Sequence, residues 1–288
     1  MSGLKPANYR SLLFIPGNQP GMIAKAAGFR PDAYVPDMED SVAVANKADA
    51  RQTVREHAAT LHAVGIPVIP RVNARDSGFA VDDLRTVVCA HIRGISIGKV
   101  NTPEDVLWIS DVLSDLEREK GMAAGGLELI LWIETALGIV NCYDICRASE
   151  RISAVAFGAE DYTHDMEIER LADESNVLYP RSMLCVAARA AGVQALDTPY
   201  FEFRNEGGLL ENAKASKTIG FKGKFAIHPA QVEPINRVFS ASDEEIDQAK
   251  RIVAAFEEAE RKGRGSTSLD GKVIDVPVYK RARALLSR

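Results

Sequence analysis

Two acidic residues, Glu134 and Asp161, are the side chains of this sequence best suited to hold a divalent metal ion. Each closes a strongly apolar run, LELILWIE for the first and ISAVAFGAED for the second, so both are expected at the ends of consecutive buried strands. Two carboxylates that leave room for water and for substrate oxygens are a common way to bind Mg²⁺. For each acid taken alone, a helix cap or a pair with a cation is an equal alternative.

A guanidinium is expected beside these acids. Arg71 ends another apolar run, in the word PRVN, and its planar fork of donors suits a carboxylate or a developing oxyanion. The alternative is an ion pair with Glu39 or Asp40 of the word DMED. The two roles are compatible, because an acidic neighbour can orient the arginine.

Four further side chains are weaker candidates. Lys25 follows the turn PGNQPGM and suits either a bound phosphate or ordinary solvent exposure. Asp275 stands among valines and an isoleucine, an apolar context that can raise a carboxyl pKa toward acid–base use, although an ordinary turn carboxylate is the alternative. Lys99 suits a Schiff base, as in other barrel aldolases, but the paired acids make a metal route simpler. His228 precedes Pro229 and is expected to be structural.

The elements that must position these residues alternate eight times along the chain. Short apolar runs are separated by amphipathic stretches with three- and four-residue apolar steps, which predicts parallel strands joined by right-handed helical crossovers. Eight evenly spaced units favour a closed (β/α)8 TIM barrel over a doubly wound open sheet. The strands of such a barrel all end on one face, so we expect one mouth of mixed charge, formed by Glu39, Asp40, Arg71, Asn73, Lys99, Glu134, Glu160, Asp161, Tyr200 and His228.

The chain is expected to contain a catalytic barrel over residues 1–240 and a C-terminal helical extension over residues 241–288. The extension begins with a Ser/Asp/Glu signature of a helix N-terminus, in SASDEEIDQAKRIVAAFEEAERKG. It exceeds what eight units need, so we expect it to pack across a barrel rim, either its own or that of a neighbouring subunit.

Composition excludes several classes of protein. Apolar residues make up 46% of the 288, enough for one sizeable core, and a net charge of -5 argues against nucleic acid as the main partner. No apolar run approaches 18 residues and the N-terminus lacks a signal-peptide core, so we predict a cytoplasmic protein without a membrane partner. The cysteines lack metal-type spacing and are expected to be reduced thiols: Cys89, Cys142, Cys146 and Cys185.

Eight words of the sequence, in order, closely resemble the citrate lyase β-subunit-like family within the HpcH/HpaI aldolase superfamily, which includes malyl-, β-methylmalyl- and citramalyl-coenzyme A lyases. The resemblance extends from about Arg10 to the C-terminus. The words are RSLLFIPGNQPGM, PDMEDSVAVANKADAR, PRVNARDSGFAVDDL, IETALGIVN, AFGAEDYTHDM, RSMLCVAARAAGVQALDTPY, GFKGKFAIHPAQ and LDGKVIDVPV.

The resemblance implies a Mg²⁺-dependent (β/α)8 barrel that forms homotrimers or a hexamer made of two trimers. By position, Glu134 and Asp161 would be the metal ligands and Arg71 the substrate-binding arginine. Glu39 and Asp40 would hold the water shell of the ion and orient polar groups.

The resemblance also assigns residues outside the metal pair. Asp275 would be the acid–base aspartate, delivered in that family by the tail of a neighbouring subunit, and Lys25 would contact coenzyme A phosphates. Gln19 stands where some coenzyme A lyases carry an arginine, which leaves an acyl carrier protein possible as the thioester carrier. Two further departures are Gly98, where a proline commonly precedes the strand-four lysine, and Pro36, which interrupts the second strand.

The predicted reaction is a retro-Claisen cleavage of a citramalyl-, malyl- or citryl-type 3-hydroxyacyl-CoA thioester to acetyl-CoA and a 2-oxo acid, with Arg71 stabilising charge on oxygen and Asp275 moving the proton. The alternatives are a citrate lyase β subunit acting on a citryl thioester of an acyl carrier protein, a malyl-CoA thioesterase, and a silent barrel that binds acyl thioesters. The sequence does not choose among the substrates, because one methyl or carboxymethyl group changes transition-state binding by only about 1–3 kcal/mol.

Overall fold

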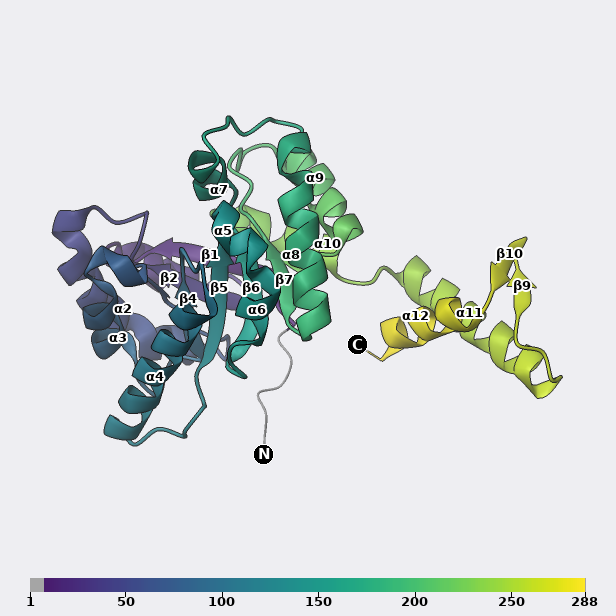
Figure 1. Ribbon diagram of the computed structural model, residues 1–288, viewed down its shortest axis with the longest axis horizontal. Helices are drawn as coiled ribbons and strands as arrows, with labels where there is room; N and C mark the ends of the chain where they lie inside the picture. Colours follow the sequence, from purple (N-terminus) through teal and green to yellow (C-terminus); the bar gives the residue numbers. More distant parts are fainter. Residues whose placement is uncertain (1–7, 288) are drawn as a thin grey trace. The chain divides into compact units, whose positions relative to one another are not determined.

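The computed structural model describes residues 8–287 and divides into two units between Phe239 and Ser240. The first unit is a closed barrel of eight parallel strands, each paired with its neighbours in chain order, and β8 pairs with β1. Helices surround these strands (Figure 1). The predicted (β/α)8 barrel is therefore confirmed. The strands are β1 Ser11–Pro16, β2 Ala33–Asp37, β3 Arg71–Val72, β4 Gly94–Ile97, β5 Glu128–Ile133, β6 Ile152–Phe157, β7 Gln194–Asp197 and β8 Gly223–Ala226.

The helices of this unit begin where the sequence supplies capping groups. Thr102 and Asp105 form a capping box with Pro103 at the first helical position, and Thr135 accepts a hydrogen bond from the Gly138 N–H. The helices are α1 Pro20–Ala26, α2 Lys47–His62, α3 Ala80–Val87, α4 Pro103–Glu119, α5 Ala136–Val140, α6 Cys142–Arg147, α7 Ala159–Asp165, α8 Leu178–Ala191, α9 Glu206–Ile219 and α10 Val232–Phe239, with 3-10 turns η1 Val44–Asn46, η2 Arg75–Ser77, η3 Ser175–Val177 and η4 Pro229–Gln231.

The strands are buried on both faces, as expected for a parallel barrel. In β5, Leu129 and Leu131 belong to the core between strands and helices, whereas Ile130 and Trp132 belong to the core inside the barrel. This alternation follows from the two-residue period of a strand. Trp132 therefore points into the barrel near the carboxyl end of β5, two residues before Glu134.

Strand β3 is much shorter than the apolar run that predicted it, because neither Pro36 of the neighbouring strand nor Pro70 of the run itself has an N–H to give. Tyr34 and Met38 of the preceding strand region donate their N–H groups to the carbonyls of Pro67 and Arg71. Pro36 stands midway between these two donors and has no N–H to give. The β2–β3 ladder is therefore reduced to one register pair, Asp37 with Arg71, besides an isolated bridge.

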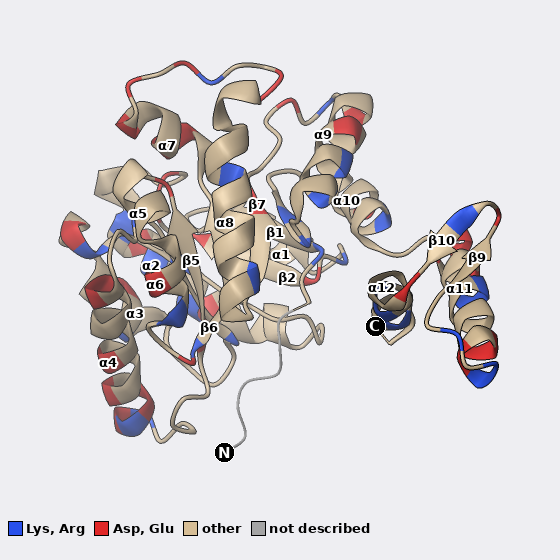
Figure 2. Ribbon diagram, turned by 45° about the vertical axis from the view of Figure 1, so that its right-hand side comes forward, with Lys and Arg blue, Asp and Glu red and all other residues tan. Residues whose placement is uncertain are grey.

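The second unit contains α11 Asp243–Arg261, a hairpin of β9 Thr267–Leu269 and β10 Lys272–Ile274, and α12 Val276–Leu286. The capping signature at its start is confirmed, because Ser242 and Glu245 form a capping box at the beginning of α11. Helix α11 carries both acidic and basic residues along its length (Figure 2). The docking of this extension on a neighbouring barrel stays a prediction.

Two further features concern the chain as a whole. In the part of the chain that the structure describes, no helix combines the length and the apolar character that crossing a membrane requires. The four cysteines are buried free thiols, in agreement with the expectation from their spacing.

Candidate active site

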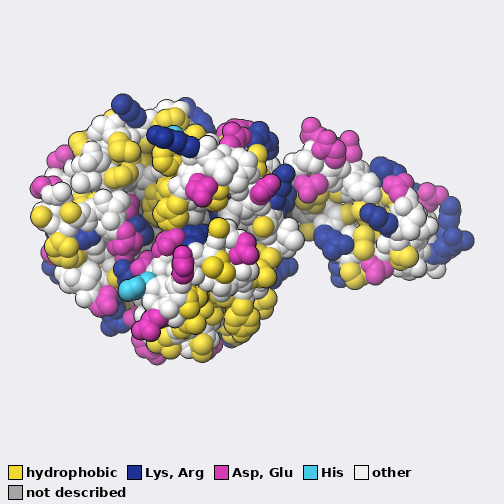
Figure 3. Space-filling model, turned by 90° about the horizontal axis from the view of Figure 1, so that it is seen from above, with side chains coloured by type: hydrophobic (Ala, Val, Ile, Leu, Met, Phe, Trp, Pro, Cys, Tyr) yellow, Lys and Arg dark blue, Asp and Glu magenta, His cyan; other side chains and the backbone are white. Residues whose placement is uncertain are grey.

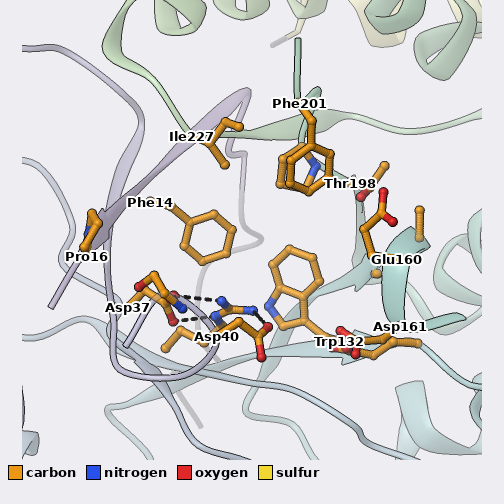
Figure 4. Close-up of a pocket in the computed structure, with 16 residues that line it drawn as sticks. Phe14, Pro16, Asp37, Asp40, Trp132, Glu160, Asp161, Thr198, Phe201 and Ile227 are labelled. Carbon is orange, nitrogen blue, oxygen red and sulfur yellow. Dashed lines mark hydrogen bonds and ion pairs between the residues drawn. The ribbon is translucent and has the colours of Figure 1, made fainter. Parts of the chain in front are cut away.

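Arg71 is fixed by three carboxylates at the mouth of the barrel. Its Nε lies 2.6 Å from Asp37 Oδ1 and its second terminal nitrogen 2.8 Å from Asp37 Oδ2, a bidentate pair. The other terminal nitrogen lies 3.0 Å from Glu39 Oε2 and 3.1 Å from Asp40 Oδ2. The guanidinium also sits 4.7 Å from the centre of the Phe14 ring (Figure 4). The pairing with Glu39 and Asp40 that the sequence suggested is therefore present.

Asp37 is the residue that the sequence analysis missed. It is the last residue of β2 and the register partner of Arg71, so the barrel itself brings the two side chains together. Burial acts to raise the pKa of Asp37, but Arg71 outweighs it and holds that pKa below the usual value. The signal was present in the word DMED, whose first acid ends the strand.

Two polar side chains, to which the sequence assigned no role, bind the backbone of the loop that follows β2. Buried Lys47 donates to the carbonyl oxygens of Met38 and Glu39 at 3.0 and 2.9 Å. Asn73 donates to the Met38 carbonyl at 3.0 Å and is itself bound by buried Asp83. These bonds fix the backbone that carries Glu39.

Glu134 and Asp161 are brought together, as the sequence predicted. Glu134 directly follows β5 and is buried, and Asp161 lies in the first turn of α7 after β6. Burial, a hydrogen bond between the two carboxyl groups and the charge of Glu39 raise the pKa of Glu134 well above its ordinary value. Burial likewise raises the pKa of Glu39 to about 7. Both Glu134 and Asp161 line the same two adjoining cavities.

This pair has the features of a Mg²⁺ site. Glu134 Oε1 is buried and has no hydrogen-bond partner among the described residues. Within the same residues, no three His, Cys, Asp or Glu side chains form a cluster that could hold a metal by themselves, and Glu134 and Asp161 both line the two cavities. Mg²⁺ is commonly held by one or two carboxylates with water and substrate oxygens completing the shell. Glu134 and Asp161 therefore fit the ion.

Two glycines leave room for these carboxylates. A Cβ atom at Gly98 would stand 3.1 Å from Glu134 Oε1 and 3.1 Å from Glu39 Oε1. A Cβ atom at Gly158 would stand 2.9 Å from the Glu134 Cβ. Gly98, which departs from the proline common in the family, therefore lies against Glu134 of the acidic pair.

The first cavity has a volume of about 370 Å³ and combines charged and aromatic walls. Phe14, Trp132 and Phe225 stack on one another inside the barrel, with ring centres 4.3 to 5.7 Å apart. Figure 3 shows acidic, basic and hydrophobic side chains around a hollow on the face of the barrel unit that it presents. The lining includes Phe14, Asp37, Asp40, Arg71, Trp132, Glu134, Glu160, Asp161, Thr198 and Phe201.

The second cavity adjoins the first and has a volume of about 730 Å³. Lys99 lines it together with Glu134 and Asp161. The Lys99 Nζ lies 3.5 Å from Glu39 Oε1. By contrast, His228 caps η4 by accepting from the Ala230 N–H at 3.2 Å and stacks on Phe203, which is a structural role.

The residues that the resemblance connects with coenzyme A lie outside both cavities. Gln19 precedes α1 and is exposed. Lys25 is also exposed and lies in the last turn of the seven-residue helix α1. Their contacts with coenzyme A stay predictions.

Asp275 lies in the C-terminal unit. Its carboxylate caps α12 by accepting from the Val278 N–H at 3.1 Å, and the side chain is exposed. The apolar surroundings expected from the neighbouring valines are therefore absent within this unit, since Val273 and Val276 are themselves exposed. Its role in acid–base chemistry stays a prediction.

The fold and the site together define a class, the (β/α)8-barrel enzymes that carry a carboxylate pair and a fixed arginine at the carboxyl ends of their strands. The model of one family, HpcH/HpaI aldolase/citrate lyase, matches residues 10–229. The chain belongs to the HpcH/HpaI aldolase/citrate lyase family, and it is accordingly a lyase.

Several relatives are similar over nearly their whole length. The citrate lyase subunit beta of Haemophilus influenzae is 38% identical over 281 residues, covering 97% of this chain and 96% of the relative. The mitochondrial citramalyl-CoA lyase of Rattus norvegicus is 32% identical, covering 100% and 88%. The (3S)-malyl-CoA thioesterase of Cereibacter sphaeroides is 35% identical, covering 93% and 90%. The family resemblance predicted from the sequence is confirmed.

Solved structures agree with this placement. The protein CitE of Mycobacterium tuberculosis, in complex with magnesium, acetoacetate and coenzyme A, matches with a TM-score of 0.78 at 27% identity and covers 98% of both chains. A citrate lyase beta subunit from M. tuberculosis, complexed with oxaloacetate and magnesium, matches with a TM-score of 0.67 at 26% identity, covering 81% of this chain and 97% of that one.

Proposed function

We propose that this chain is a Mg²⁺-dependent carbon–carbon lyase that cleaves a 3-hydroxyacyl-CoA thioester of the citramalyl, malyl or citryl type to acetyl-CoA and a 2-oxo acid. The observation that carries the proposal is the shared cavity in which the Glu134–Asp161 pair adjoins Arg71. Relatives named as citrate lyase subunit beta and citramalyl-CoA lyase support it. So do solved relatives that hold magnesium with coenzyme A or oxaloacetate.

Glu134 and Asp161 would hold the ion. A bound Mg²⁺ supplies Lewis-acid polarisation of the substrate's hydroxyl and carboxylate oxygens, which makes that hydroxyl easier to deprotonate. Glu39 and Asp40 flank the site from the loop after β2 and are proposed to orient the water around it.

In the cleavage, the hydroxyl of the substrate loses its proton and the bond between its carbon and the neighbouring thioester α-carbon breaks. The bonding electron pair passes to the thioester as an enolate, whose carbon then takes up one proton, so no net proton is consumed. Arg71 is proposed to stabilise the negative charge that develops on oxygen. Its orientation is set in advance by Asp37, which holds two of its nitrogens.

Asp275 is the proposed proton-transfer residue, supplied by the C-terminal unit of a second subunit. Its carboxylate is exposed at the start of α12, so it is accessible to another chain. This role requires an oligomer, and we propose a homotrimer or a hexamer. Lys25 and Gln19 are the proposed contacts for the nucleotide end of coenzyme A, and a cytoplasmic location remains part of the proposal.

The test is to incubate the purified protein and Mg²⁺ with a panel of 3-hydroxyacyl-CoA thioesters and to identify the products. Release of acetyl-CoA with pyruvate, glyoxylate or oxaloacetate is the expected result. Glu134→Gln is expected to remove most of the turnover. Full turnover by this variant in excess chelator would contradict the metal-based proposal.

Two alternative outcomes are favoured by particular relatives. The similarity to citrate lyase subunit beta favours action on a citryl thioester of an acyl carrier protein, which activity on the carrier but not on free coenzyme A thioesters would reveal. The similarity to a (3S)-malyl-CoA thioesterase favours hydrolysis, which free coenzyme A without acetyl-CoA would reveal.

A further inference from the structure

Lys99 has an unfavourable backbone conformation at the carboxyl end of a barrel strand. It follows β4 and Gly98, and its φ is 56°, in the left-handed region. A side chain with a Cβ atom loses conformational free energy there, whereas glycine adopts this region freely. A lysine at such a position indicates that its side chain is functional, because strained residues concentrate at functional sites.

The Lys99 side chain lies in the second cavity and is held loosely. Its side chain is 38% exposed, and the structure gives its ammonium one ion pair among the described residues, with Glu39 Oε1 at 3.5 Å. That distance exceeds the range of a well-formed hydrogen bond. The ammonium is therefore free to turn toward a ligand at little cost.

Arg71 is in the opposite condition. Its Nε and one terminal nitrogen are committed to Asp37, and the other terminal nitrogen lies within 3.1 Å of Glu39 and Asp40. Its hydrogen bonds to Asp37 and Asp40 use three of its five N–H donors, and Glu39 lies against one of its terminal nitrogens as well. Of the lysine and arginine side chains that line the two cavities in the described part of the chain, Lys99 is the less engaged by protein contacts and has the more donors to spare.

The acidic surroundings of Lys99 favour a positive charge at this position. The second cavity is lined by five acidic residues: Asp76, Glu134, Asp161, Asp165 and Glu167. A substrate that carries a carboxylate meets repulsion there, and an ion held by two of these acids offsets only part of it. Burial acts to lower the pKa of Lys99, but the charges of Glu39 and Asp161 outweigh it, so the ammonium stays charged.

We propose that Lys99 is a substrate-binding residue. Its ammonium turns from Glu39 to a carboxylate on the half of the substrate that leaves as the 2-oxo acid. Arg71 then stabilises the reacting oxygen, and Lys99 holds the acid group. This inference rests on the proposed function, because it takes the acid half to be a 2-oxo acid. It gives the strained backbone at position 99 a function in ligand binding.

The experiment is an equilibrium titration of the full-length protein with oxaloacetate and with pyruvate, by calorimetry in saturating Mg²⁺. Lys99→Met and Lys99→Gly are expected to raise the Kd of at least one of these acids by about tenfold to a hundredfold, the loss expected for a charge-assisted hydrogen bond. Lys99→Arg is expected to recover part of the affinity. Mg²⁺ itself is expected to bind Lys99→Met and Lys99→Gly at least as tightly as the wild type, since a nearby positive charge is removed.

A matched control separates binding from backbone strain. Asp270 is another non-glycine residue in the left-handed region, at φ 50° in the β9–β10 turn, and it is not among the residues that line either cavity. Lys99→Gly and Asp270→Gly are both expected to relieve backbone strain. At position 99 this relief is measured as a higher Tm for Lys99→Gly than for Lys99→Met. Asp270→Gly is expected to leave the Kd of the 2-oxo acids unchanged.

The outcomes are distinct. If the wild type binds a 2-oxo acid and Lys99→Met binds it with the same Kd, the inference about Lys99 is overturned while the proposed function stands. If the wild type binds neither acid in the presence of Mg²⁺, the proposed function itself fails and the inference falls with it.

Discussion

Arg71 illustrates, at the level of single residues, how the site is prepared before a substrate arrives. Asp37 holds one edge of the guanidinium through two short bonds, and the Phe14 ring lies under its face at 4.7 Å. A charge fixed in this way needs little rearrangement when negative charge develops nearby. In the proposed mechanism, Asp37 at the end of β2 is therefore a positioning residue that acts through Arg71.

Asp37→Asn tests this control. The variant keeps the shape of the side chain but removes the charge that pairs with buried Arg71, so we expect about 3–5 kcal/mol of lost stability. We also expect turnover to fall about tenfold or more as the arginine loses its orientation. Urea unfolding and steady-state kinetics measure the two effects. Glu206→Gln, which breaks an exposed pair with Arg237, is the control and is expected to cost less than about 1 kcal/mol.

Gly98→Ala tests the space around the acidic pair. The added methyl group would meet Glu134 Oε1 and Glu39 Oε1 at 3.1 Å, so these oxygens must move by a few tenths of an ångström. We expect Mg²⁺ affinity to fall about tenfold, comparable to the loss of a supporting contact around a metal, while the fold stays intact. Calorimetric titration with Mg²⁺ measures the change. Gly21→Ala, where an added Cβ meets no atom within 4 Å, should bind Mg²⁺ normally.

The acids and the arginine could be found from the sequence because each stands directly after an apolar run. Asp37 was not singled out from the three acids of the word DMED, because only the strand register shows which of them lies directly beside Arg71 in the barrel. The strained backbone of Lys99 was likewise hidden, since no turn signal besides Gly98 marks it.

At the level of elements, a buried charge network joins β7 and β8 to the helices behind them. Asp197, at the end of β7, accepts from Lys224 of β8 at 2.6 Å and from Arg181 of α8 at 2.9 Å. Ser216 of α9 donates to the same carboxylate at 2.6 Å. This network could not be predicted from the sequence, because charged residues are usually expected to face the solvent.

This network makes stability depend on pH in acid. Burial acts to raise the pKa of Asp197, but Lys224 and Arg181 lower it from 3.8 to about 2. A depressed pKa gives stability that is complete above pH 4 and lost as the pH falls toward 2, by about 2 kcal/mol in all. Urea unfolding from pH 6 to 2 measures the slope. Asp197→Asn is expected to be less stable throughout and to show a shallower slope, and equal slopes would contradict the assignment.

Most elements of the barrel followed from the alternation of apolar runs and amphipathic stretches. The exception is β3, whose length is limited by the N–H groups that are missing at Pro36 in the neighbouring strand and at Pro70 in its own run. The sequence showed Pro36 as an interruption of its own strand, but the proline also shortens the strand beside it.

At the level of the whole molecule, the barrel unit carries the carboxylate pair of Glu134 and Asp161, while Asp275 lies in the separate C-terminal unit. If Asp275 serves a neighbouring subunit, two inactive variants can repair each other. We expect Glu134→Gln and Asp275→Asn to be nearly inactive alone and to regain up to about a quarter of wild-type activity when dissociated, mixed in equal amounts and reassembled, because random pairing restores that share of sites.

Native mass spectrometry of the same mixture, with one variant labelled uniformly with ¹⁵N, shows whether mixed oligomers have formed. Mixed oligomers without any recovered activity would contradict the supply of Asp275 by a second subunit, and would leave the metal site as it stands.

The central claim is that Glu134 and Asp161 hold one Mg²⁺ beside Arg71. A crystal structure of the protein with Mg²⁺ and a 2-oxo acid tests it most directly. We predict one ion that is about 2.0–2.1 Å from an oxygen of each carboxylate, in the cavity that Arg71 lines. Carboxylates that point away from each other, with no ion between them under the same conditions, would contradict the account.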